Sequence, residues 1–250
     1  MEAAFLLKLQ SAGRLSDGDR ERLSKLCDDI RPFHARRDII REGDRPDHVH
    51  LMIEGWSCRY KMLADGTRQI TAFLVPGDFC DTQITIFDEM DHSIGSLTDC
   101  QVAFVPRALI AELTEQPAIA RALWWASLVD EAVLRAWIVN MGRREAQDRI
   151  AHLICELHAR LRNVGLAPGN SFELPLTQEE LSDALGLTSV HVNRTLKRLR
   201  EDGLMTFRRQ QIVITDVPAL RKIADFDPNY LHLPAGVGED LGARARFSQP

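Results

Sequence analysis

The first 30 residues place apolar side chains at helical spacing. Ser16 stands at a predicted helix start, and Asp17 and Asp19 fall in the first turn, where carboxylates favour the helix N-terminus. Apolar positions then recur as a predicted stripe of Leu23, Leu26 and Ile30. We therefore expect helical structure before the first strand.

Between residues 32 and 106 the pattern becomes alternating. Gly43, Gly55, Gly66 and Gly77 follow one another at intervals of 12, 11 and 11 residues, with runs such as HVHLMI and QITAFLV between them. Short strands at this spacing, separated by turn glycines, are typical of a sandwich or barrel. The segment is predicted to form a small antiparallel β-roll.

A long helix is predicted from Pro117 to about Asn140, with a break at Gly142. Steps of three and four residues, as in a coiled-coil seam, connect Ile119, Ala122, Ala126, Val129, Val133 and Ala136. A second apolar side holds Trp125, Leu128, Ala132 and Val139. We predict a homodimer with an interface of Ala122, Trp125, Ala126, Val129, Val133 and Ala136. A helix buried within one monomer is the alternative.

Residues 177–203 carry the start and stop signals of two short helices. Thr177 and Glu180 form a capping box, and Gly186 supplies the left-handed residue that ends the first helix. Thr188 caps the second helix, which ends at Gly203. The predicted inward-facing residues are Leu181, Ala184, Leu185, Val192, Leu196 and Leu199. Two short helices joined by a tight turn predict a helix-turn-helix.

The second of these helices has a polar, basic side, although the whole chain has a net charge of -5. The DNA major groove admits one α-helix, whose first residues reach the base edges. The following segment, LMTFRRQQIVITD, predicts a two-stranded wing. We predict DNA contacts from Thr177, Thr188, Ser189, Val190, His191, Asn193, Arg194, Lys197, Arg198, Arg208 and Arg209. A merely solvated helix is the alternative.

Composition fits a soluble protein, with 45% hydrophobic and 27% charged residues. The first apolar run, at residues 3–7, is short and follows Glu2, so no secretory signal is expected. The longest apolar stretch is interrupted by Asp130, Glu131 and Arg135, which argues against a membrane span. Five cysteines at wide spacing do not indicate a disulfide framework, and the cytoplasm is the predicted compartment.

The segment LTQEELSDALGLTSVHVNRTLKRLREDGLM resembles the winged helix-turn-helix of the Crp/Fnr transcription regulators. The glycine-spaced roll and the helix from Pro117 follow that family's order, over about residues 10–220. The resemblance implies an α+β fold: an N-terminal antiparallel β-roll (a cyclic-nucleotide-binding-like jelly roll), a long dimerisation helix and a C-terminal winged helix-turn-helix. It also implies a homodimer on a two-fold symmetric DNA operator, with RNA polymerase as a further partner.

The implied division of the chain is a sensor domain at 1–115, a dimerisation helix at 116–141, a DNA-binding domain at 142–220 and a tail at 221–250. The last segment, after Pro228, is rich in Gly and Pro and is expected to be poorly packed.

The resemblance also assigns the base-reading positions to Ser189, Val190, His191 and Arg194. Arg194 matches the family's frequent recognition arginine. Val190 departs from the glutamate that many members have, and Asn193 departs from a small residue. The operator is therefore expected to differ from the family's familiar ones.

The sensor departs further from members that bind cyclic AMP. Asp81 and Thr82 replace a Gly-Glu pair, and His92 and Ser93 replace Arg-Ser. Asp81 would repel a phosphate and no arginine is evident to pair with one, so cyclic AMP is not expected to bind in the usual way. These four residues are the candidate effector-binding positions for an unknown small molecule.

No cofactor is predicted. An iron–sulfur cluster needs about four thiolates, and only Cys27 precedes the roll. The other strand-region cysteines, Cys58, Cys80 and Cys100, are expected to be buried rather than redox-active. His48 and His50 share one face of a strand but lack a third metal ligand, so a solvated strand face is favoured and no metal is predicted.

Two features leave alternatives open. Trp124 and Trp125 are expected to pack in the core or the seam, and an apolar ligand pocket is the alternative. The helix-turn-helix could also serve a ligand-sensing module that acts on a protein partner. An enzyme is not expected, because the chain lacks a nucleophile elbow, a phosphate loop and a metalloprotease motif.

Overall fold

The computed structural model describes residues 3–234 and divides the chain into two compact units, with the division after Leu128. The division falls inside α4 (Pro117–Arg143), which begins in the first unit and continues into the second. Among the described residues, no helix is long and apolar enough to cross a membrane.

The chain begins with α1 (Ala4–Gln10), α2 (Asp17–Ser24) and the 3-10 helix η1 (Lys25–Cys27). Ser16 caps α2 in a capping box with Asp19, as predicted. Leu23 and Leu26 are buried, but Ile30 is 41% exposed and opens the first strand. The predicted helical stripe therefore ends at Leu26, because the backbone is already extended at Ile30.

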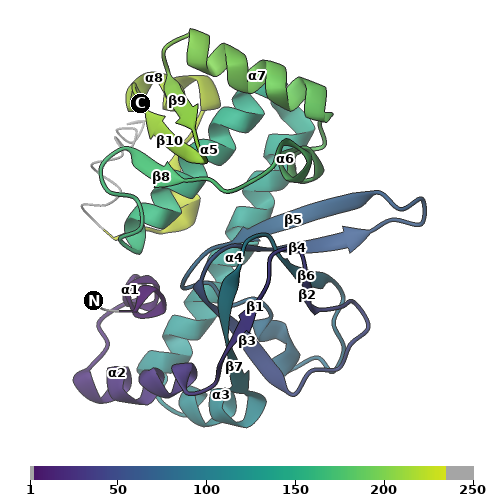
Figure 1. Ribbon diagram of the computed structural model, residues 1–250. Helices are drawn as coiled ribbons and strands as arrows, with labels where there is room; N and C mark the ends of the chain where they lie inside the picture. Colours follow the sequence, from purple (N-terminus) through teal and green to yellow (C-terminus); the bar gives the residue numbers. More distant parts are fainter. Residues whose placement is uncertain (1–2, 235–250) are drawn as a thin grey trace, which may run out of the picture. The chain divides into compact units, whose positions relative to one another are not determined.

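The roll consists of two antiparallel sheets, one with strand order β1-β7-β3 and one with order β2-β6-β4-β5 (Figure 1). The strands are β1 (Ile30–Phe33), β2 (Asp38–Ile40), β3 (His48–Glu54), β4 (Ser57–Met62), β5 (Arg68–Leu74), β6 (Ser93–Ser96) and β7 (Cys100–Pro106). A short 3-10 helix, η2 (Thr82–Thr85), lies between β5 and β6 in the chain.

The predicted turn glycines all have positive φ angles. Gly55 is the most constrained of them, because a Cβ atom there would lie 2.3 Å from the carbonyl oxygen of Asp99. Only glycine fits this turn between β3 and β4, both in conformation and in space. The regular glycine spacing therefore reflects where strands must reverse direction.

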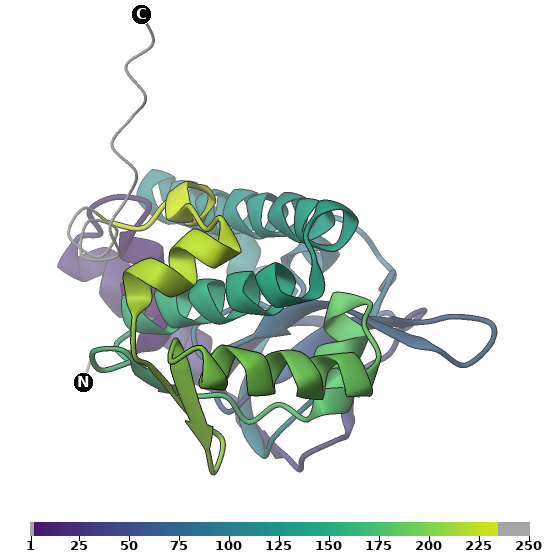
Figure 2. The ribbon, with the colours of Figure 1, turned by 90° about the horizontal axis from the view of Figure 1, so that it is seen from above.

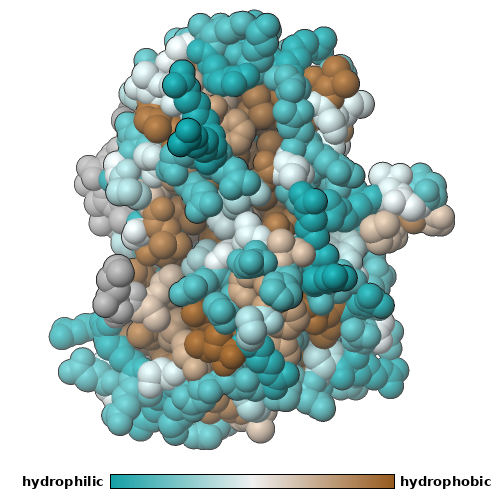
Figure 3. All heavy atoms as spheres, in the orientation of Figure 1, coloured by the Kyte–Doolittle hydropathy of each residue, from teal (hydrophilic) through white to brown (hydrophobic). Residues whose placement is uncertain are grey.

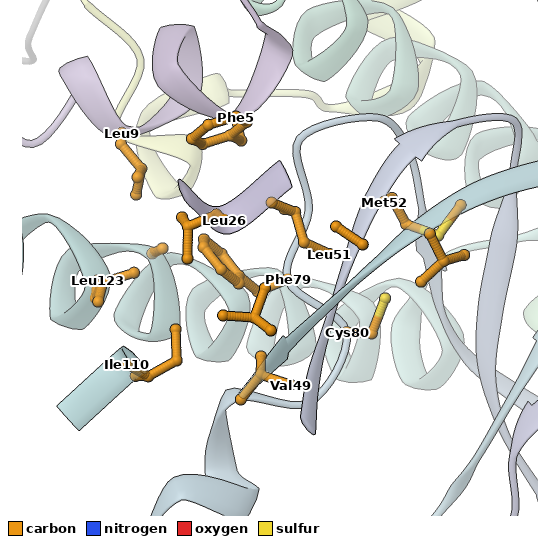
Figure 4. Packing of buried hydrophobic residues seen from close by; sticks show 14 of the residues in the cluster. Phe5, Leu9, Leu26, Val49, Leu51, Met52, Phe79, Cys80, Ile110 and Leu123 are labelled. Atoms are coloured by element: carbon orange, nitrogen blue, oxygen red, sulfur yellow. The ribbon is translucent and has the colours of Figure 1, made fainter. Parts of the chain in front are cut away.

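The hydrophobic core of the first unit lies between the roll and the helices around it (Figure 4). Phe5 and Leu9 of α1 pack toward Leu26, Phe79 and Leu123, which come from three other segments. Burying each such side chain stabilises the fold by about 1.5–3 kcal/mol. The cluster also includes Ile110 of α3 (Arg107–Thr114).

Most residues of the predicted dimer seam on α4 are covered by side chains of the same chain. Ala122 and Ala126 belong to the buried core cluster of the first unit, and Trp125 packs partly buried against it. Val129 and Val133 are also buried, and Ala136 is half-buried. The chain's own side chains cover this side because small residues let α4 approach closely. The exposed apolar side of α4 is another one, holding Trp124, Leu128, Leu134, Ile138 and Val139.

Gly142 does not break the helix where the sequence suggested. It lies in the last turn of α4, and the chain leaves helical geometry only after Arg143. Glu145 then adopts an extended conformation as the N-cap of the next helix, α5 (Ala146–Asn163). Glycine near a helix end costs little, since the last turn is already frayed.

The second unit surrounds α5, which contacts both α7 (Ser189–Glu201) and α8 (Val217–Ala224). A three-stranded antiparallel sheet has the order β8-β10-β9. Its strands are β8 (Ser171–Glu173), β9 (Met205–Arg208) and β10 (Gln211–Ile214). The remaining helices are α6 (Gln178–Leu185) and the 3-10 helix η3 (Pro228–Leu231).

The predicted tail at 221–250 is packed as far as residue 234, and the poor packing expected after Pro228 is wrong for Tyr230 and Leu231. Arg221 and Ala224 are buried in α8, and Phe226, Pro228 and Leu231 are buried after it. These apolar side chains cover α5, and the Tyr230 hydroxyl donates to Glu156 Oε2 at 2.8 Å. The rest of the predicted tail, residues 235–250, lies outside the described residues.

Glu156 is the centre of a buried polar cluster in this unit. Its carboxylate also accepts hydrogen bonds from Trp137 Nε1, at 3.1 Å to each oxygen, and from Arg160 at 3.3 Å. Burial raises the pKa of the Glu156 carboxyl, and Arg160 and the hydrogen bonds act in the opposite direction. The cluster joins α4, α5 and the segment after α8.

His152 gives the second unit a predictable dependence on pH. Burial lowers the pKa of His152 to about 3, the nearby Arg144 contributes in the same direction, and Asp225 opposes them. The unfolded chain takes up a proton below its ordinary pKa of about 6.5, whereas the folded chain does not until about pH 3. The contribution of His152 to the free energy of unfolding is therefore fully present above pH 6.5. It decreases as the pH falls below 6.5, by up to about 1.4 kcal/mol per pH unit.

We expect His152→Phe to flatten the loss of stability between pH 7 and pH 5 in urea unfolding followed by circular dichroism. Phenylalanine keeps the ring contacts with Phe226 and Tyr230. His34→Gln, which changes a side chain that is 93% exposed, is the matched control and should leave the slope unchanged. An unchanged slope in His152→Phe would contradict the assignment.

Candidate nucleic-acid interface

Helix α6 begins at a capping box, as predicted. The Thr177 hydroxyl accepts the Glu180 N–H at 3.1 Å, and the Glu180 carboxylate accepts the Thr177 N–H at 2.7 Å. Thr177 is therefore engaged in holding α6, and its backbone N–H group is already paired. Leu181, Ala184 and Leu185 are buried, so α6 is fixed through its inner side.

The turn between α6 and α7 is set by two residues. Gly186 has φ 61° and ends α6 in the left-handed conformation, with the Leu187 N–H bonded to the Ser182 carbonyl at 3.2 Å. Thr188 is extended and its hydroxyl accepts the His191 N–H at 3.2 Å, which begins α7. Both features follow from local chemistry that is legible in the sequence.

One side of α7 anchors the helix in the second unit. Val192, Leu196 and Leu199 are buried, as predicted, and Thr195 is buried beside them. Most of the remaining surface of the helix is exposed and hydrophilic, as the top of Figure 3 shows, and Val190 is an exposed apolar exception. Because the buried stripe fixes the rotation of the helix, the opposite side chains are held toward solvent.

The exposed side chains of the first turns are Ser189, Val190, His191, Asn193 and Arg194. Within residues 3–234, Arg194 forms no hydrogen bond or ion pair. Asn193 is different, since its Nδ2 donates to Gln178 Oε1 on α6 at 3.2 Å. Arg194 is thus available to an external acceptor, whereas Asn193 is oriented by the neighbouring helix.

The second half of α7 carries paired charges. Lys197 lies 3.6 Å from Glu201, and Arg198 lies 3.9 Å from Asp202, all of them exposed. Exposed pairs of this kind contribute only about 0–1 kcal/mol. They leave both cations able to turn toward a phosphate.

The predicted wing is present as the β9–β10 hairpin, which lies beside α7 (Figure 2). Arg209 and Gln210 form its turn with φ angles of 49° and 66°. Two successive positive φ angles match the twist of a tight hairpin. Arg208 and Arg209 are exposed and, in the described part of the chain, unpaired.

Two domain models match this chain. The Crp-like helix-turn-helix domain covers residues 148–223, and the cyclic nucleotide-binding domain covers residues 30–116. The helix-turn-helix model covers the helices of the second unit, and the nucleotide-binding model covers the roll. The chain belongs to the Crp/Fnr family of DNA-binding transcription regulators.

Relatives in the Crp/Fnr family include the transcriptional activator protein FnrL of Cereibacter sphaeroides, 28% identical over 79% of this chain and 81% of FnrL. The nitrogen fixation regulation protein FixK of Azorhizobium caulinodans is 26% identical over 76% of this chain and 77% of that protein. The structure of FixK2 from Bradyrhizobium japonicum superposes with a TM-score of 0.69 and 26% identity, covering 78% of this chain and 96% of FixK2.

In this Crp/Fnr regulator, the side chain of Asp81, a predicted effector-binding residue, is bonded to His50 of the same chain. The Asp81 carboxylate is fully buried, and it accepts the His50 N–H at 2.7 Å and contacts His50 Nδ1 at 2.5 Å. The expectation of a solvated strand face is therefore wrong at His50, which is 2% exposed and also meets the edge of Phe104. Sequence reasoning missed this pair because it treated the two residues as parts of separate motifs.

The other candidate effector residues also have partners within the first unit. Thr82 Oγ1 lies 3.3 Å from Ser127 Oγ, and Ser93 Oγ accepts the Glu42 N–H at 3.0 Å. His92 Nδ1 lies 2.6 Å from Asp91 Oδ1, while its buried Nε2 has no hydrogen-bond partner among residues 3–234. Burial lowers the pKa of His92, and the nearby Arg59 acts in the same direction.

An arginine does reach this region, contrary to the expectation from sequence. Arg59 of β4 donates to the carbonyl oxygens of Phe79 and Cys80, at 2.8 and 2.7 Å. It was missed because it lies in a strand distant from the motif that carries the family's phosphate-binding arginine. Its guanidinium holds the segment before η2 in place.

The cysteines of the roll are buried, as predicted for Cys58, Cys80 and Cys100. Burial raises the pKa of the Cys100 thiol to about 11 and that of the Cys80 thiol well above its ordinary value. Thiols with raised pKa values are poor nucleophiles. Across the described residues, no three His, Cys, Asp or Glu side chains gather in a group that could hold a metal ion.

Proposed function

We propose that this regulator binds a two-fold symmetric operator as a homodimer, under the control of a signal received by the roll. The observation that supports it most strongly is the set of exposed side chains Ser189, His191 and Arg194 on the first turns of a capped helix. Arginine bonds the O6 and N7 atoms of guanine in a bidentate manner, and this pairing supplies about 1–3 kcal/mol of discrimination.

Other predicted contacts serve to position the protein. The N–H groups at the start of α7 favour a phosphate, as helix N-termini do. Arg208 and Arg209 at the wing, with Lys197 and Arg198 on α7, are proposed to contact the DNA backbone. Thr177 and Asn193 are proposed to act mainly through α6, since both are bonded to residues of that helix.

The homodimer is proposed to form through the exposed apolar side of α4. Trp124 and Leu128 are 69% and 45% exposed, and Ile138 and Val139 are 68% and 51% exposed. Trp124, Leu128 and Ile138 share one side of α4 at coiled-coil spacing, and the exposed ion pair of Glu131 and Arg135 lies between Leu128 and Ile138 on that side. Large apolar side chains gathered on one exposed helix side favour protein association.

The signal is proposed to be something other than cyclic AMP bound in the usual mode. A phosphate at Asp81 would have to displace His50 and approach a buried carboxylate. RNA polymerase is the proposed protein partner, because FnrL and other relatives are named transcriptional activators. We further infer a cytoplasmic location, which agrees with five unpaired cysteines, and no catalytic role.

In vitro selection from a random duplex library with the full chain tests this proposal. The expected result is a pair of inverted half-sites with centres about 34 Å apart, or one helical turn. Enrichment of unrelated sequences, or of a single half-site without symmetry, would overturn it.

A further inference from the structure

Val190 is an exposed apolar residue on α7 whose side chain does not help to anchor that helix. It is 75% exposed, whereas Val192, two residues later, is fully buried in the anchoring stripe. A β-branched residue is also a poor helix former. A single exposed valine needs no explanation by itself, so its position relative to the other side chains must decide whether it has a role.

That position is the stripe that holds Arg194. Residues four apart lie one above the other on a helix, so Val190 and Arg194 face the same way, with Lys197 one turn further on. All three are exposed. Whatever surface Arg194 approaches, Val190 approaches too, and the valine comes nearer the helix N-terminus.

A valine side chain can neither donate nor accept a hydrogen bond. Against the edge of cytosine or adenine it would remove water from a polar group without replacing the lost bond. The 5-methyl group of thymine is the one apolar group that a base presents in the major groove. An exposed valine in that groove therefore favours thymine by chemistry alone.

We infer that Val190 reads the methyl group of a thymine close to the guanine that Arg194 reads. The inference rests on the proposed function and specifies one part of its operator. Four residues advance a helix by about 6 Å, and base pairs are about 3.4 Å apart along the duplex, so the thymine lies within about two base pairs of that guanine.

Deoxyuridine substitution tests this directly, since it removes only the methyl group. The probe is the duplex selected by the full chain, with each thymine of a half-site replaced in turn by deoxyuridine. One replacement is expected to weaken binding about fourfold, the effect of exposing a single buried methyl group. No effect at any thymine within two base pairs of the Arg194-dependent guanine would overturn the inference.

Variants assign the methyl contact to Val190. Val190→Ala should discriminate less between the thymine and deoxyuridine duplexes, because its side chain is shorter, and Val190→Glu should prefer cytosine at that position, because glutamate accepts a hydrogen bond from the cytosine amino group. Val213→Ala, which changes a 40% exposed valine on β10, should keep the fourfold methyl effect. An undiminished fourfold methyl effect in Val190→Ala would overturn the assignment.

The two proposals fail in distinguishable ways. If the unmodified chain shows no preference among duplex sequences, the proposed function itself fails, and the role of Val190 fails with it. If sequence preference is intact and depends on Arg194 but ignores the methyl group, only the role of Val190 is overturned.

Discussion

Ile138→Asp is expected to convert the protein to a monomer and to weaken its binding to the selected duplex by about 10²–10⁴-fold. Ile138 is 68% exposed on α4, so aspartate should leave the monomer folded. In a dimer, however, the carboxylate would lie unpaired within the apolar contact, which is costly. Losing the partner removes the second half-site contact, and the advantage of linked binding disappears with it.

Sedimentation of the variant alone, followed by titration with the duplex, measures both effects. Ile86→Asp is the matched control, because Ile86 is 81% exposed but lies outside α4. The control should remain dimeric and bind normally. A dimeric Ile138→Asp variant with unchanged affinity would contradict the proposed interface.

Arg194→Ala is expected to reduce operator affinity by about 1–3 kcal/mol and to remove the preference at one base pair of each half-site. The reason is that Arg194 is unpaired in the described part of the protein, so its loss costs the fold nothing. Titration against duplexes that vary at each position measures the change. Equal loss across every operator variant would show that Arg194 contacts only the backbone.

Arg208→Ala provides the contrast for that measurement. The residue is exposed on the wing and is proposed to contact phosphate. Its loss should weaken binding to all sequences alike and reduce the salt slope by about one.

The helix-turn-helix could be predicted from sequence because its determinants are local. The capping box of Thr177 and Glu180 spans three residues, and Gly186 and Thr188 define the turn without reference to the rest of the chain. The buried stripe of α7 likewise follows from the helical period alone. Short-range chemistry was sufficient there.

The covered side of α4 could not be predicted in the same way. Two sides of this helix are apolar, and periodicity does not say which one meets the chain's own core. The structure places Ala122 and Ala126 in that core and leaves Trp124 and Ile138 exposed. The side of α4 with the alanines lies inside, because these small side chains allow the helix to pack closely against the core.

Long-range contacts explain the remaining differences. Asp81 and His50 are 31 residues apart, and Glu156 and Tyr230 are 74 apart. Neither pair shares a motif or a helical or strand period. The sequence therefore predicted neither the Asp81–His50 pair in the roll nor the packing of the segment after α8. The Gly and Pro content after Pro228 pointed away from the packing seen at Tyr230.

Recognition of DNA by the exposed side of α7 is tested most directly by fluorescence anisotropy with the selected duplex and a shuffled duplex of the same composition. We expect the full chain to prefer the selected duplex by at least about 10³-fold. Affinity for both should fall steeply between about 50 and 200 mM salt, because bound cations release counterions from the phosphates. Equal affinity for the two duplexes, or binding that does not respond to salt, would contradict the account.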